Sequence, residues 1–83
     1  MTTDPATLRH EILKLAALHD ATGSASYLED VQIAAALTQP LGVTQTQIRI
    51  LEHDGMIDSA TSFGPSYAIR ITPAGLKHLE SPE

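Results

Sequence analysis

The sequence of 83 residues contains no cysteine. A disulfide framework and a thiolate metal site are therefore both excluded. Aromatic residues are also scarce, with one phenylalanine, two tyrosines and no tryptophan. A hydrophobic core must consequently be built mostly from Leu, Ile, Val and Ala, and a chain of this length buries only a modest share of its surface.

Positive charge is scarce as well. The chain has 5 Lys and Arg residues against 10 Asp and Glu residues, which gives a net charge of −5 when His is neutral. Phosphate contacts from basic residues supply a large part of the affinity of DNA-binding proteins. The small number of basic residues therefore argues against tight DNA binding by a single copy of this chain.

The sequence has no long apolar run that approaches the ~20 residues of a membrane-spanning helix. Residues 1–5 are polar and acidic and do not have the pattern of a signal peptide. We therefore expect a cytoplasmic protein without membrane contact. We expect one domain over residues 1–83, with an ordered core at about 5–80.

Two helices are predicted in the first half of the chain. Asp4-Pro5 indicates a helix start, because Asp caps free N–H groups and Pro is tolerated at the first helical position. This helix is expected at about 5–20. Ser26 and Glu29 have the spacing of a capping box, with Asp30 as a rival N-cap, and a second helix should follow and end near residue 40.

Thr44 is the predicted N-cap of a third helix, which should run to about His53. Gly55 then suits the left-handed turn after a helix end. Helical spacing turns Ile48 and Leu51 inward. The opposite side of this helix is predicted to carry Thr46, Ile50 and His53, flanked by Arg49.

The apolar spacing then changes from helical to alternating. Residues 56–59 can form a short strand, and residues 60–66 form a loop. Tyr67, Ile69 and Ile71 alternate with other residues as in a half-buried strand, so the two strands make one hairpin. Thr72-Pro73 repeats the cap-plus-proline pattern and opens a last short helix.

Three helices followed by a hairpin is the order of a winged helix-turn-helix, and the residues themselves resemble that superfamily. Ile33-Ala34, Leu37, Leu41-Gly42-Val43-Thr44, Ile48 and Leu51 through Ile57 look like the helix–turn–helix and first strand of prokaryotic winged-helix regulators. The closing stretch from Ile71 to Glu80 is similar to the strand-to-helix end of MarR-type proteins, where Gly75 would let a helix approach a strand closely. The resemblance implies an α+β winged helix with three helices, a two-stranded wing and a short C-terminal helix.

The sequence departs from the MarR-type pattern in two places. The third helix is expected to be about one turn shorter between Thr44 and Leu51 than in that family. The wing at 60–66 carries no Lys or Arg, whereas the family often has a basic contact to DNA there. Both departures weaken the case for DNA binding.

The resemblance implies a DNA-binding transcriptional regulator that places its third helix in the major groove. Gln45 could pair with adenine, Arg49 with guanine, and Thr46 could contact a thymine methyl group. The alternative is that these polar residues are simply solvated. The candidate DNA-binding residues are Thr44, Gln45, Thr46 and Arg49.

The competing hypothesis is an acidic winged-helix module that binds a protein, as an adaptor, an antagonist or a subunit, without direct DNA contact. Ile50 on the predicted exposed face and Phe63 at the wing tip could form an apolar patch, unless Ile50 packs under the wing. Leu13 and Leu18 lie away from the main apolar stripe of the first helix, so a homodimer could bury them. A wider core-facing stripe is the alternative explanation.

No residue pattern indicates catalysis. The four histidines form no compact pair at the spacing of metal ligands, so we expect no metal site. There is no Gly-rich phosphate loop, and no Ser with a His and Asp at an interpretable spacing. We therefore expect no cofactor and no enzymatic activity.

Overall fold

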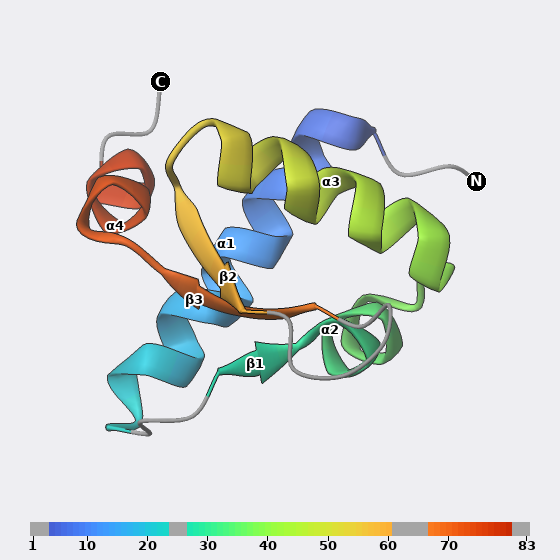
Figure 1. Ribbon diagram of the computed structural model, residues 1–83, viewed down its shortest axis with the longest axis horizontal. Coiled ribbons are helices and arrows are strands. Elements are labelled where there is room, and N and C mark those ends of the chain that lie inside the picture. The colour runs from blue at the N-terminus through green and yellow to red at the C-terminus, as the bar shows by residue number, and fades with distance from the viewer. Residues whose placement is uncertain (1–3, 24–26, 61–66, 81–83) are drawn as a thin grey trace.

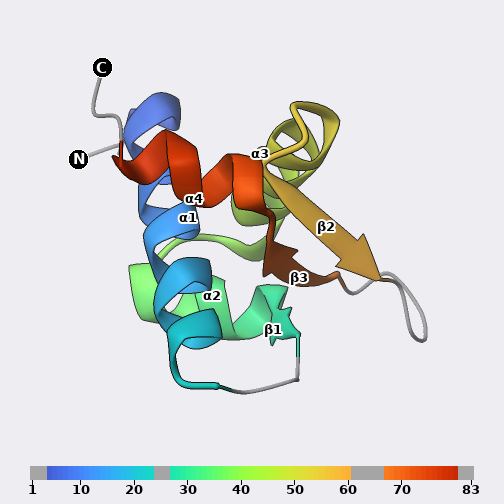
Figure 2. The ribbon, with the colours of Figure 1, turned by 90° about the vertical axis from the view of Figure 1, so that its left-hand side faces the viewer.

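The computed structural model of the protein describes residues 4–23, 27–60 and 67–80 (Figure 1). Within these residues it has four helices and a three-stranded antiparallel sheet, which confirms the predicted α+β class. In Figure 2, α1 and α4 lie on one side of the molecule, whereas α3 and the β2–β3 ribbon lie towards the other side. The elements in chain order are α1 (Pro5–Ala21), β1 (Leu28–Glu29), α2 (Asp30–Leu37), α3 (Leu41–His53), β2 (Ile57–Ala60), β3 (Ala68–Ile71) and α4 (Pro73–Glu80).

The start of α1 is as predicted. Asp4 is the N-cap, and its Oδ2 accepts hydrogen bonds from the backbone N–H groups of Ala6 at 3.1 Å and Thr7 at 3.3 Å. Pro5 follows as the first helical residue, where its missing N–H leaves no hydrogen bond unmade. The helix ends at Ala21, one residue beyond the predicted end.

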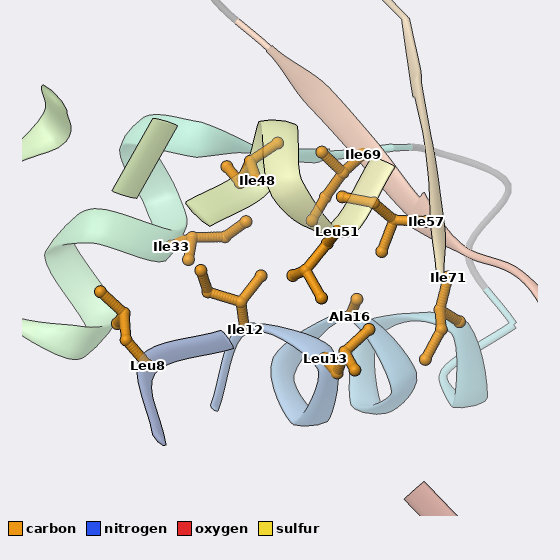
Figure 3. Close-up of a cluster of buried hydrophobic side chains, with 10 residues drawn as sticks. All are labelled: Leu8, Ile12, Leu13, Ala16, Ile33, Ile48, Leu51, Ile57, Ile69 and Ile71. Carbon is orange, nitrogen blue, oxygen red and sulfur yellow. The ribbon is translucent and has the colours of Figure 1, made fainter. Parts of the chain in front are cut away.

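An aliphatic core joins α1 to the other elements. Figure 3 shows the side chains of α1 facing those of α2, α3, β2 and β3. Because aromatic side chains are scarce, this layer consists mainly of isoleucine and leucine, as predicted. Its members are Leu8, Ile12, Leu13, Ala16, Ile33, Ile48, Leu51, Ile57, Ile69 and Ile71.

The start of α2 differs from the prediction. The N-cap is Glu29, whose backbone N–H donates to Gln32 Oε1 at 3.1 Å. Asp30 is not a cap but the first helical residue, and it is fully buried. Ser26, the other predicted cap, lies outside the described residues.

The turn between α2 and α3 is shorter than predicted. Thr38 ends α2 in the left-handed conformation, with φ 55°, which is strained for a β-branched residue. Pro40 is the N-cap of α3, and its fixed φ suits a residue that directly precedes a helix. The predicted start at Thr44 is wrong, because Thr44 Oγ1 donates back to the Pro40 carbonyl at 3.1 Å from within α3. With 13 residues from Leu41, α3 contains the turn that the prediction omitted.

The sheet has one strand more than predicted. The β2–β3 hairpin is present, with Ile57 opposite Ile71 and Ser59 opposite Ile69. The third strand, β1, pairs with the other edge of β3, so the strand order is β1-β3-β2. With only two residues, β1 is too short to show the alternation by which a strand is recognised in a sequence.

The start of α4 packs tightly against Met56, just before β2, and against the end of β3. Thr72 Oγ1 accepts a hydrogen bond from the Gly75 N–H at 3.1 Å, which confirms the predicted cap. A Cβ atom at position 75 would overlap the Met56 carbonyl oxygen and lie 2.7 Å from Ile71 Cγ1. Glycine at position 75 therefore permits the close approach of helix and strand.

We predict that Gly75→Ala lowers the free energy of unfolding by at least about 1–3 kcal/mol, because the Met56 backbone would have to move. Gly42→Ala is the matched control, since a Cβ atom there has nothing within 4 Å. Gly42 lies in the first turn of α3, so its replacement should stabilise the helix by up to about 1 kcal/mol. Urea unfolding followed by circular dichroism measures both, and equal midpoints for the two variants would contradict the prediction.

Candidate nucleic-acid interface

The third helix, α3, has one buried side and one exposed side. Its buried residues are Thr44, Gln47, Ile48 and Leu51. Gln47 accepts a hydrogen bond from Arg9 of α1 at 2.8 Å, which ties the two helices together. The side of α3 that faces away from this packing carries Val43, Thr46, Arg49, Ile50 and His53, all exposed.

Of the four candidate DNA-binding residues, only Thr46 and Arg49 are exposed. Thr44 is fully buried, so a base contact from it is ruled out, because the helix begins earlier than predicted. Gln45 is half-buried, and its Nε2 donates to Asp30 at 2.8 Å. Thr46 and Arg49 are exposed on the same side of α3. These two residues remain candidates for a contact with DNA.

Asp30 links three elements beneath this surface. Its Oδ2 accepts hydrogen bonds from Gln45 Nε2 at 2.8 Å and from the Tyr67 N–H at 3.0 Å. Its own backbone N–H donates to the Tyr67 carbonyl at 2.8 Å. The carboxylate therefore connects the start of α2 to α3 and to the residue that precedes β3. Its Oδ1 is buried and has no hydrogen-bond partner among the described residues.

From its position in the sequence, Asp30 is predicted only as a possible helix cap. Its role could not be read from local spacing, because its side-chain partners lie 15 and 37 residues away along the chain. An acidic residue next to a helix start is ordinarily explained by capping alone. Only the folded chain brings the partners together.

The charge near α3 differs from that of the whole chain. Residues 31–51 contain no Asp or Glu, although the chain has 10 such residues. Arg49 is exposed and forms no hydrogen bond or ion pair with the described residues. By contrast, Lys14 Nζ lies 3.3 Å from Glu11 Oε2, and Arg70 Nε lies 3.8 Å from Asp20 Oδ1. From Leu41 to Leu51, α3 thus carries one basic residue and no acidic residue, and the exposed Glu52 follows near its end.

The candidates for protein contact also differ in their exposure. Ile50 is 37% exposed, so it does not pack into the interior. Leu18 at the end of α1 is 66% exposed. Leu13 was expected to be available to a partner, which is wrong: it is 1% exposed, because β3 and α4 as well as α3 pack on α1 and widen its buried stripe. Phe63 lies outside the described residues.

A cleft of about 300 Å³ lies where α1, α3 and α4 meet, away from the exposed side of α3. Its volume is at the small end of the range of ligand pockets. No group of three side chains within the described residues could hold a metal ion. The cleft is lined by Ala6, Arg9, His10, Leu13, Leu51, Asp54, Met56 and His78.

Solved structures with the same arrangement of elements identify the fold. MepR from S. aureus, in a crystal structure of its complex with DNA, matches with a TM-score of 0.72 at 22% identity. AF1382 from Archaeoglobus fulgidus matches with a TM-score of 0.76 at 22% identity. A MarR protein from Peptoclostridium difficile matches with a TM-score of 0.63 at 17% identity. This chain has a winged-helix fold.

The winged-helix neighbours are longer than this chain. The match to MepR covers 88% of this chain and 51% of MepR. The match to AF1382 covers 89% of this chain and 78% of AF1382, and the match to the MarR protein covers 92% of this chain and 44% of that protein. The chain therefore spans about half the length of MepR. Comparisons with protein-family models and with curated protein sequences find no match. Among the described residues, no helix is long and apolar enough to span a membrane.

We predict that Asp30→Ala lowers the free energy of unfolding by about 1–3 kcal/mol, because the part-buried N–H of Tyr67 and the amide of Gln45 both lose their acceptor. Asp58→Ala is the matched control, because Asp58 is exposed and faces only Arg70 across the ladder. Its removal should cost less than about 1 kcal/mol. Urea unfolding measures both variants, and a loss at Asp30 no larger than the loss at Asp58 would disprove the linking role.

Proposed function

We propose that this chain is a DNA-binding transcriptional regulator that contacts duplex DNA through the exposed side of α3. The observation that carries the proposal is the charge pattern. The chain as a whole is acidic, yet residues 31–51 contain no acidic residue, and Arg49 projects from α3 without a partner among the described residues.

The dimensions of α3 suit the major groove. A helix of 13 residues is about 20 Å long at 1.5 Å per residue, and the major groove of about 12 Å accepts one helix. The β2–β3 ribbon lies on the same side of the molecule as α3 in Figure 2, so both can approach one duplex. The sparse charge of this surface implies few phosphate contacts and a shallow dependence of affinity on salt.

The direction of approach follows from where the acids lie. Glu52 and Asp54 stand at the end of α3, and Asp58 follows in β2. These carboxylates would repel phosphates, whereas the positive end of the helix dipole lies at Leu41. The first two turns of α3 should therefore enter the groove most deeply. In this orientation Thr46 would lie near the bases.

The shared fold supports the proposal at a coarser level. MepR has been crystallised with DNA, and its fold matches this chain over 88% of its residues. None of the three similar structures is described as an enzyme. A homodimer stays a prediction, with Leu18 as its candidate contact. Two copies would double the small number of phosphate contacts that one copy can make.

We predict that Arg49→Ala weakens binding to duplex DNA by about fivefold or more, as expected for the loss of one arginine contact worth about 1–3 kcal/mol. Lys14→Ala is the matched control, because Lys14 belongs to α1, outside α3 and the ribbon, and is paired with Glu11. It removes the same charge and should change affinity little. Fluorescence anisotropy with labelled duplexes at low salt, where phosphate contacts are strongest, measures both.

Two outcomes would overturn the proposal. One is the absence of affinity for any duplex at low salt. The other is an equal loss of affinity in both variants, which would indicate binding by overall charge. In either case the acidic protein-interaction module becomes the better hypothesis. Its test is a pull-down in which Ile50→Asp abolishes capture of a specific partner.

A further inference from the structure

The exposed side of α3 carries an apolar row. Val43 is 44% exposed and Ile50 is 37% exposed. The two residues are seven positions apart, so they lie two helical turns apart on the same side, and Thr46 lies between them. Single exposed apolar residues are ordinary on a protein surface, but two aligned on the side of α3 proposed to meet DNA need an explanation.

The threonine in this row adds to its apolar character. Thr46 Oγ1 donates to the carbonyl of Gly42, one turn earlier, at 3.0 Å. The hydroxyl is thus satisfied by the backbone of α3. The methyl group is the part of the Thr46 side chain left for an outside contact. The row Val43–Thr46–Ile50 therefore offers mainly hydrocarbon.

The hydrogen-bonding groups of α3 lie beside this row. Gln45 donates to the buried Asp30 and so turns its amide towards the interior. Arg49 and His53 are exposed next to the row. The contact surface thus combines a strip of hydrocarbon with one arginine.

In the major groove the apolar group of a base pair is the thymine methyl, and apolar side chains contact it. We propose that the row Val43–Thr46–Ile50 reads thymine methyl groups, with Arg49 pairing with a guanine beside them. This inference rests on the proposed DNA binding and adds the base class that is recognised. The absence of acids in residues 31–51 and the charge of Arg49 favour a polyanion over a protein as the occupant.

The test begins by finding a site. The wild-type chain selects duplexes from a synthetic pool with a random central segment, and the selected sequence is made in two forms. One form contains thymine, and the other has deoxyuridine in place of each thymidine, which removes only the methyl groups. Loss of a buried methyl should weaken binding about fourfold for each contacted thymine, on the scale of ~0.8 kcal/mol per group.

Variants assign the effect to the row. Ile50→Ala and Val43→Ala should each bind the thymine duplex more weakly and show a smaller difference between the two duplexes. Leu76→Ala is the matched control, because Leu76 is as exposed as Ile50 and belongs to α4, which lies on the other side of the molecule from α3 (Figure 2). It should keep the full difference. Any effect of uracil on duplex shape persists in all variants, so the change in the difference isolates the side-chain contact.

The outcomes separate this inference from the proposed function. Binding that shows a preferred sequence but no loss on uracil substitution overturns the thymine readout and leaves DNA binding intact. Binding without any preferred sequence does the same. Absence of binding to every duplex at low salt overturns both. A methyl effect that Val43→Ala and Ile50→Ala leave unchanged places the readout elsewhere and also overturns the inference.

Discussion

The fold depends on one layer of aliphatic side chains shared by α1, α3 and the ribbon. Ile48 of α3, Ile57 of β2 and Ile69 of β3 are each at most 1% exposed and belong to one cluster with Ile12 of α1 (Figure 3). Without cysteines and with few aromatic residues, the chain relies mainly on this layer to hold its elements together. The position of α3 and the direction of the ribbon both follow from this contact.

A second constraint acts at the surface of the core. Asp30 places a carboxylate in a fully buried position and uses it to bind α3 through Gln45 and the start of β3 through Tyr67. Burying a charge is costly unless hydrogen bonds compensate. The compensation comes from two elements that are far apart in sequence, so the side chain also fixes how α3 sits relative to the ribbon. A recognition surface built on both elements needs such a fixed geometry.

The sequence predicted the elements better than their boundaries. Asp4 and Thr72 cap helices as expected, and Gly75 allows the close contact that was inferred for it. The start of α3 was misplaced, because Pro40 and Gly42 are typical of turns and hid a helix that begins between them. Glycine in a first helical turn costs little when core contacts further along hold the helix.

The sequence predicted which residue types form the candidate site and on which side of α3 they lie. It did not predict how exposed each of these side chains is. Thr46 and Arg49 are exposed as periodicity indicated. The prediction for Thr44 was wrong because α3 starts at Leu41, so Thr44 lies within the helix and faces the core instead of capping the helix. The prediction for Leu13 was wrong because the spacing of apolar residues along α1 does not show how many other elements pack on that helix.

The sequence by itself determined the class of the fold, the aliphatic nature of its core and the exclusion of cysteine chemistry. These properties depend on composition and on local spacing, which act over a few residues. Only the tertiary structure decided that β1 joins the sheet, that Asp30 links α2 to α3, and that Val43 and Ile50 stay exposed while Leu13 does not. Each of these depends on which distant segments pack together, and local spacing carries no information on that.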